Sequence, residues 1–94
     1  MIKVEVKYIL KQGQRDAFYN AIVEQGIDVA AKNEAGNIKY DFDIPANEPD
    51  VLYLHELWQD SDALALHGQV EHYKALALLK EKYVLDTIIE KESI

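Results

Sequence analysis

The sequence predicts an α+β fold of the ferredoxin-like type, with a four-stranded antiparallel sheet that carries helices on one face. Three observations predict it: a strict two-residue alternation near the N-terminus, two long helical stretches that each follow a strand, and the element order β-α-β-β-α-β. No repeat, low-complexity tract or linker divides residues 1–94, so we interpret them as a single domain.

The stretch IKVEVKYIL, residues 2–10, alternates between apolar and charged side chains and is typical of a half-buried strand. Its inward positions are Ile2, Val4, Val6, Tyr8 and Leu10. A turn with one glycine leads into a helix that we predict over about residues 15–34, with an interruption at Gly26. Gly36 stands where a C-terminal helix cap is expected.

Two further strands are predicted around a loop that contains both prolines of the chain. NIKYDFDI, residues 37–44, alternates and places Tyr40 inward. VLYLHELW, residues 51–58, is apolar on both faces, which favours a strand that is covered on both sides. Its Glu56 and Trp58 share the face that we assign to the helices.

Asp60 is a good N-cap for a second helix, because its carboxylate can accept from the free N–H groups of the first turn. We predict that this helix runs to about Lys82 and bends near Gly68. YVLDTIIE, residues 83–90, is the fourth predicted strand.

The sheet face opposite the helices is expected to be open. Tyr53, His55 and Leu57 lie near the middle of this face, and charged residues surround them. An apolar patch on an open sheet face favours contact with a second copy of the chain. We therefore expect a homodimer, with His55 at its interface.

Composition excludes several classes of function. The chain has 17 acidic and 10 basic residues, a net charge of −7, so binding to nucleic acid or to an anionic membrane is not expected. It has no cysteine, which excludes disulfides, thiolate chemistry and cysteine-based zinc sites. The N-terminal stretch has no uninterrupted apolar run, so neither a signal peptide nor a membrane span is predicted there, and we expect a cytoplasmic protein.

Glu56 and His67 are the predicted catalytic pair. A carboxylate on a helix-covered strand face requires a partner or a polar cavity, and a nearby imidazole paired with it could act as a general base. The alternative for Glu56 is that it reaches solvent at the strand end. The alternative for His67 is a partly buried structural role.

The remaining histidines do not predict a metal site. His72 follows His67 by five residues, so the two side chains point about 140° apart on an ideal helix. They would share a metal only if the helix bends at Gly68. Inward aromatic residues such as Tyr8, Tyr40 and Trp58 are usually core, but they also recur in pockets for flat ligands.

Two stretches, EAGNIKYDF and LYLHELWQDSDALALHGQVEHYK, together resemble the antibiotic-biosynthesis monooxygenase domain family. The resemblance consists of a glycine before a strand with an inward tyrosine, a Glu-x-Trp strand end, an acidic helix start, and two histidines, the second followed by an aromatic residue. The matching positions are Glu56, Trp58, Asp60, Ala63, His67, His72 and Tyr73. With the element order, the resemblance covers nearly the whole chain.

This resemblance implies a dimeric α/β barrel in which two ferredoxin-like sheets pack face to face. Several family members oxidise quinols or polycyclic phenols with O₂ and use no metal or flavin. For this chain it implies His67 as base or acid, with Glu56 to orient it. The implied substrate-binding residues are Trp58, Tyr40, Tyr8, His72 and Tyr73.

Two alternatives to a cofactor-independent monooxygenase stay open. Another branch of the family isomerises a phosphorylated signalling sugar derivative without a cofactor, and this sequence resembles that branch about as closely. Some members have no demonstrated activity, so a ligand-binding or dimerisation module is the third hypothesis.

Overall fold

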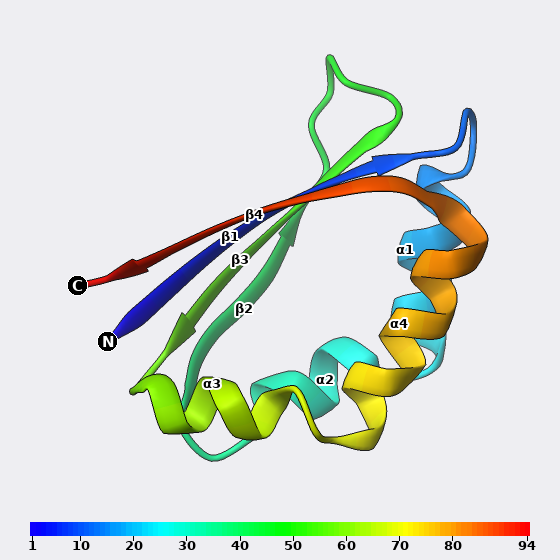
Figure 1. Ribbon diagram of the computed structural model, residues 1–94. Coiled ribbons are helices and arrows are strands. Elements are labelled where there is room, and N and C mark those ends of the chain that lie inside the picture. Colours follow the sequence, from blue (N-terminus) through cyan, green and yellow to red (C-terminus); the bar gives the residue numbers. More distant parts are fainter.

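The computed structural model describes all 94 residues and confirms the α+β, ferredoxin-like architecture (Figure 1). Its elements follow the predicted order, with each predicted helix divided in two. They are β1 (Ile2–Leu10), α1 (Arg15–Glu24), α2 (Ile27–Lys32), β2 (Asn37–Asp43), β3 (Val51–Trp58), α3 (Ser61–His67), α4 (Glu71–Tyr83) and β4 (Val84–Ser93).

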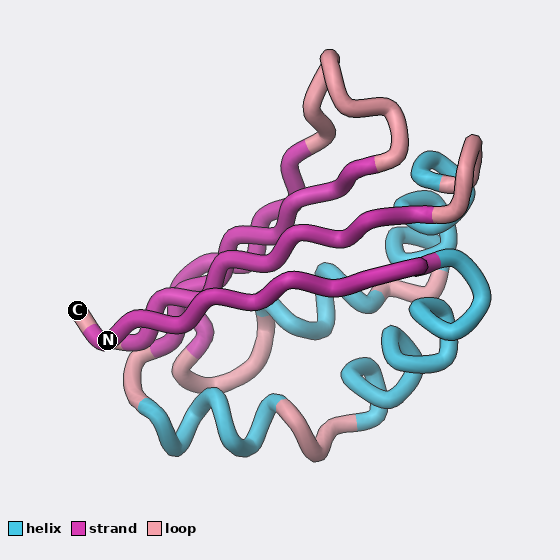
Figure 2. The backbone as a smooth tube through the Cα atoms, turned by 45° about the horizontal axis from the view of Figure 1, so that its top comes forward, coloured by secondary structure: helices cyan, strands magenta, loops and turns pink.

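The four strands form one antiparallel sheet in the order β2-β3-β1-β4. All four helices lie on the same side of this sheet, and α3 and α4 connect the end of β3 to the start of β4 (Figure 2). In the register of the sheet, Val4 of β1 stands opposite Glu56 of β3 and Lys91 of β4. These three side chains therefore share the face that the helices cover.

The hydrophobic core fills the layer between sheet and helices. The predicted alternation is confirmed on β1, where Val4, Val6 and Tyr8 are all buried. Phe18 of α1 is fully buried and meets the Tyr8 ring edge to face, with ring centroids 5.4 Å apart. Such aromatic pairs contribute about 0.5–1.5 kcal/mol beyond the area they bury.

The interruption expected at Gly26 is a complete break, which divides the helix predicted over residues 15–34 into α1 and α2. Gly26 has a φ of +68°, a left-handed conformation that ends α1 and starts α2 in a new direction. Gly36 is not a helix cap, because α2 already ends at Lys32. Gly36 has a φ of +87°, and a Cβ there would lie only 2.6 Å from the Cβ of Ala63. A glycine at this position therefore allows α3 to approach the start of β2.

The second predicted helix is also divided. Asp60 caps its start as predicted, because Asp60 Oδ1 accepts from the Ala63 N–H at 2.8 Å. At Gly68 the helix does not merely bend: α3 ends at His67, and α4 begins only at Glu71. None of the helices is both long and apolar enough to span a membrane.

The open face of the sheet carries the side chains that we assigned to it. Tyr53 and His55 are half-buried there, and each pairs with an acid. The Tyr53 hydroxyl donates to Glu48 at 3.0 Å, and His55 contacts the Glu5 carboxylate of the neighbouring strand. This face is thus more polar than the sequence pattern alone indicated.

Candidate functional site

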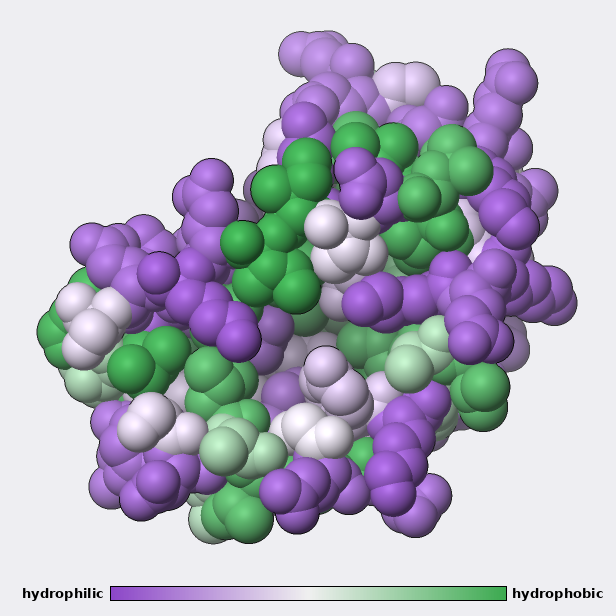
Figure 3. Space-filling view, in the orientation of Figure 1, coloured by the Kyte–Doolittle hydropathy of each residue, from purple (hydrophilic) through white to green (hydrophobic).

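A cavity of about 110 Å³ lies between the sheet and helices α3 and α4. Figure 3 shows this side of the molecule hollowed between strands and helices, with hydrophobic and hydrophilic side chains both present around the hollow. The residues around the cavity are Val4, Val6, Tyr8, Tyr40, Leu54, Glu56, Leu64, His67, Tyr73, Leu76, Ala77, Lys80, Ile89 and Lys91.

Burial divides this lining into a floor and a mouth. The polar side chains of the floor are Tyr8, Tyr40, Glu56 and His67, and each residue is at most 7 % exposed. The mouth contains exposed residues, among them Tyr73, Ile89 and Lys91. A ligand would therefore place one end among buried polar groups and the other near solvent.

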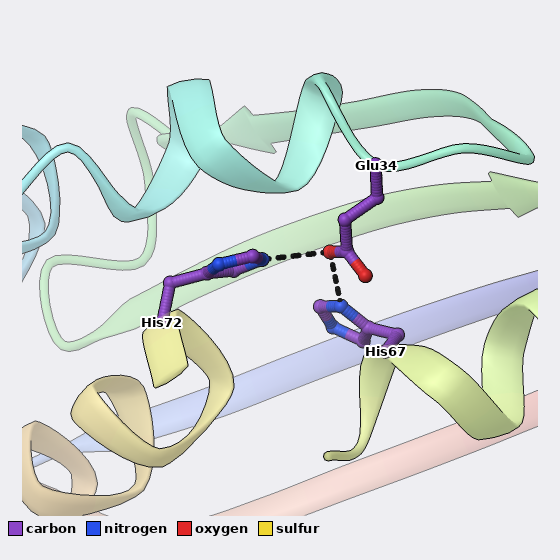
Figure 4. Close-up of side chains that lie close together, drawn as sticks. All are labelled: Glu34, His67 and His72. Atoms are coloured by element: carbon purple, nitrogen blue, oxygen red, sulfur yellow. Dashed lines mark hydrogen bonds and ion pairs between the residues drawn. The ribbon is translucent and has the colours of Figure 1, made fainter. Parts of the chain in front are cut away.

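His67 is held by a residue that the sequence did not identify. Its Nδ1 lies 2.6 Å from Glu34 Oε2, and the same oxygen lies 2.7 Å from His72 Nε2 (Figure 4). Glu34 follows α2, His67 ends α3, and His72 is in the first turn of α4. No local pattern marks Glu34, because an acid between a helix and a glycine is ordinary on a protein surface.

The Glu34 contact defines the chemical state of the His67 ring. A carboxylate oxygen only accepts, so Nδ1 of His67 carries a proton and, in the neutral ring, Nε2 is left with the lone pair. Burial lowers the pKa of His67, and this effect outweighs the opposing hydrogen bond and charge of Glu34. The ring is thus an imidazole that is neutral near pH 7 and can accept a proton.

Aromatic rings hold this imidazole in place. The Trp58 ring centroid lies 4.6 Å from that of His67, and those of Tyr73 and Tyr40 lie at 5.1 and 6.0 Å. Trp58 itself is fully buried and does not line the cavity. The expectation that Trp58 is a cavity wall is therefore corrected: it lies behind the His67 ring.

The expectation that Glu56 orients His67 is wrong. The Trp58 indole N–H donates to Glu56 Oε1 at 3.0 Å, because residues two apart on a strand share a face, while His67 turns to Glu34. The alternative that Glu56 reaches solvent is also wrong, since the residue is only 7 % exposed. Burial raises the pKa of Glu56 to about 7, although the Trp58 hydrogen bond opposes this shift.

Tyr8 and Tyr40 bring two phenol hydroxyls to the floor of the cavity. Neither hydroxyl has a hydrogen-bond partner in the protein, and neither is sealed in the core, since Asp28 Oδ1 is the only enclosed unpaired side-chain atom. Burial raises the pKa of both hydroxyls well above the ordinary value, so both stay protonated and can donate.

The predicted site residues thus fall into two groups. His67, Glu56, Tyr8, Tyr40 and Tyr73 meet around one cavity. His72 is not part of the cavity lining and joins the site only through Glu34. The structure adds two lysines of the lining, Lys80 on α4 and Lys91 on β4, and neither forms an ion pair with an acid.

The Glu34, His67 and His72 side chains could also hold a metal ion. Their donor atoms, two imidazole nitrogens and one carboxylate oxygen, all lie within 4.8 Å of one another. Of these three residues, His67 is buried, and Glu34 and His72 are half-buried.

Comparison with known protein families identifies one that matches this chain. Residues 1–77 match the model of a family described as antibiotic biosynthesis monooxygenase. No curated protein sequence matches the chain.

Solved structures share the fold over the full length of the chain. A candidate antibiotic biosynthesis monooxygenase from Nitrosomonas europaea superposes with a TM-score of 0.90 at 19 % identity, over 100 % of this chain and 98 % of that one. A conserved protein of unknown function from Bacteroides thetaiotaomicron, described as a possible oxidoreductase, gives 0.87 at 22 % identity, over 99 % and 96 %. A conserved protein from Methanosarcina mazei gives 0.85 at 24 % identity, over 97 % and 89 %. At such identities the likeness shows the fold alone.

Proposed function

Because this chain belongs to the antibiotic biosynthesis monooxygenase family, we propose that it is an oxidoreductase that oxidises a small quinol-like or enolisable molecule with O₂, without metal or flavin. The observation that carries the proposal is the floor of the cavity. There, a buried imidazole with an available nitrogen shares a small space with two unpartnered phenol hydroxyls.

The proposed reaction begins with proton transfer from a substrate hydroxyl to Nε2 of His67. The electron-rich anion then forms a carbon–oxygen bond to O₂, which gives a peroxide on the substrate ring. Proton return and loss of water leave a new carbonyl, so one oxygen atom enters the substrate and the other leaves as water. All four electrons that reduce O₂ come from the substrate, whose reacting carbon loses its hydrogen and becomes the new carbonyl carbon as the ring is oxidised.

The Tyr8 and Tyr40 hydroxyls can donate hydrogen bonds to the substrate anion that this reaction requires. Donors fixed in a water-poor cavity stabilise a developing oxyanion more strongly than water does, because they need no reorganisation. Lys80 and Lys91 add two positive charges to the cavity lining. The whole chain has a net charge of −7, so these two lysines, which form no ion pair, are a local exception that favours an anionic substrate.

Cavity size limits the substrate. An engineered apolar cavity of about 150 Å³ holds one benzene molecule. The cavity here, at about 110 Å³, is smaller but reaches solvent, since its lining includes the exposed residues Tyr73 and Ile89. We propose a single-ring substrate whose reacting hydroxyl enters the floor while its substituents extend through the mouth.

A cofactor-free isomerase is the second candidate, and one observation favours it. Glu56 and His67 both line the cavity, and the pKa of Glu56 is raised to about 7, so a carboxylic acid and an imidazole base are available together. An acid and a base on one substrate are sufficient to move a proton between adjacent carbons. This reaction needs no O₂.

Oxygen dependence separates the two candidates. Uptake of O₂ is measured with a panel of single-ring quinols, and product formation is measured in air and under argon. We expect turnover in air only, and His67→Ala is expected to lower it by about 10²–10⁴-fold. His55→Ala is the matched control, because this histidine lies on the opposite sheet face. Turnover that continues under argon would contradict the monooxygenase and support the isomerase. If no substrate reacts, the hypothesis of a non-enzymatic binding module is supported instead.

We also propose that the chain forms a homodimer through the open face of the sheet. Leu57 and Tyr53 supply apolar surface there, and Glu5 and His55 supply a hydrogen-bonded polar pair that a second copy could meet. Light scattering coupled to gel filtration is expected to give a dimer of the 10.8 kDa chain. Leu57→Asp is expected to shift the mass to that of the monomer, and a monomeric wild-type protein contradicts the proposal.

A further inference from the structure

We propose that Glu34, His67 and His72 form a binding site for a divalent transition metal such as Zn²⁺, and that an occupied site switches off the His67 base. The metal-binding half stands independently of the proposed function. The inhibitory half rests on it, because it concerns the nitrogen that the proposed reaction uses.

The site is assembled from three separate segments. Glu34 lies between α2 and β2, His67 is the last residue of α3, and His72 lies in the first turn of α4. On a continuous helix, a spacing of five residues would direct the two imidazoles about 140° apart. The break between α3 and α4 removes this restriction and directs both rings to the same carboxylate oxygen (Figure 4).

The donor set suits zinc and its neighbours. Two imidazole nitrogens and one carboxylate oxygen bind Zn²⁺ and similar ions, usually at about 2.0–2.2 Å. Two ligand atoms about 2.1 Å from a tetrahedral ion lie about 3.4 Å apart. The present contacts of 2.6 and 2.7 Å are hydrogen bonds, so each nitrogen would have to move by less than about 1 Å to admit an ion.

The adjustment is small for the side chains concerned. The Glu34 and His72 side chains are 12 % and 18 % exposed, so both reach the surface and can shift without disturbing the core. This partial exposure also gives an ion a route to the site. His67 is the fixed ligand, since its side chain is 6 % exposed and lies against the Trp58 ring.

Electrostatics also favours a cation. The Glu34 carboxylate is largely buried, and the side-chain nitrogens within 4.0 Å of it belong to the two imidazoles, with no lysine or arginine among them. The nearest preceding lysine, Lys32, pairs with Asp41 instead. A divalent ion would therefore supply positive charge that no fixed cation provides here.

Metal binding has a direct consequence for the proposed base. In the metal-free site, Nδ1 of His67 donates its proton to Glu34, and Nε2 carries the lone pair. A metal on Nδ1 requires that nitrogen to give up its proton, and a neutral ring then carries it on Nε2. The nitrogen that accepts the substrate proton becomes a donor. Occupancy therefore blocks the first step of the proposed reaction.

The test is a titration of the untagged chain with zinc, monitored by calorimetry, after EDTA treatment and removal of the EDTA. Trp58, the only tryptophan, lies beside His67, so quenching of its fluorescence by Ni²⁺ or Cu²⁺ gives a second readout. We expect one ion for each chain. Glu34→Gln and His72→Gln, checked for folding by circular dichroism, are each expected to weaken binding by at least about tenfold.

His55→Gln is the matched control, because His55 also lies between two carboxylates, those of Glu5 and Asp43, but on the other sheet face. If only His55→Gln weakens binding, or if both site variants bind zinc as the wild type does, the proposed site is wrong. An absence of binding in the wild type overturns it as well.

Activity tests the inhibitory half. With a substrate that is turned over, Zn²⁺ is expected to lower the rate in proportion to occupancy, and EDTA is expected to restore it. Occupancy with an unchanged or increased rate overturns the inhibitory half. If no substrate reacts, the proposed function fails, and the zinc titration still decides the binding half.

Discussion

Glu56 offers the sharpest test of how the site is built. The structure buries this carboxylate on the sheet face below the helices and gives it one hydrogen bond, from the Trp58 indole at 3.0 Å. A glutamine at this position can still accept that bond through its amide oxygen, but it cannot ionise. Glu56→Gln therefore removes the buried charge with little change in shape.

The magnitude of the effect follows from the pKa. Burial raises the pKa of Glu56 from 4.5 to about 7, so the folded protein holds a proton that the unfolded chain has already released at neutral pH. At about 1.4 kcal/mol for each pH unit, this difference corresponds to about 3 kcal/mol. The wild type has this stability in full below pH 4.5 and loses it progressively as the pH rises through about 7.

The assay is urea denaturation of the wild type and Glu56→Gln at pH 5 and at pH 8. We expect the two free energies of unfolding to differ by less than about 1 kcal/mol at pH 5, and the variant to be more stable than the wild type by about 3 kcal/mol at pH 8. For a domain of this size, 1 kcal/mol corresponds to a melting temperature shift of about 4–8 °C. The titration of His67 is common to both proteins and cancels in the difference.

An equal difference at both pH values would refute the reasoning, since it would show that the carboxyl ionises as readily in the folded protein as in the unfolded chain. Activity supplies an independent readout. If Glu56 is the acid of an isomerase, the variant loses turnover, whereas a monooxygenase that uses His67 alone keeps a measurable rate. The stability result does not depend on which of these holds.

Three further predictions concern single positions. Gly36→Ala is expected to destabilise the fold by roughly 2–5 kcal/mol, because a Cβ there meets Ala63 and the φ of +87° is unfavourable for alanine. Thermal unfolding measures this loss. Gly26→Ala is the matched comparison, since its φ is +68° but no atom lies near the added Cβ. It is expected to cost only about 1–2 kcal/mol of stability. An equal loss of stability in the two variants would contradict the effect assigned to the contact with Ala63. Tyr40→Phe is expected to leave the melting temperature unchanged or slightly higher while it weakens substrate binding, measured as KM, and a large loss of stability would indicate a hydrogen bond that the structure lacks. Asp60→Ala is expected to lower the free energy of unfolding by about 1 kcal/mol through loss of the helix cap, and no change in urea denaturation would contradict this.

The sequence alone determined the elements and their faces, because these depend on periodicity and on short-range signals. Alternation along residues 2–10 predicted which side chains of β1 are buried, and Asp60 predicted a capped helix start. The composition also excluded cysteine chemistry. The resemblance to the family, carried by residues such as Glu56 and His67, is confirmed by the match over residues 1–77.

Only the tertiary structure decided which of these residues meet. Glu34 is 33 residues from His67 in sequence, and no local pattern encodes a contact over that distance. The convergence of His67 and His72 depends on the helix break between α3 and α4, whose length the sequence did not specify. Glu56 contacts Trp58 because the two share a strand face, whereas His67 contacts the carboxylate of Glu34, which follows a different helix. Contacts between separate elements depend on how the chain packs, and periodicity within one element cannot supply them.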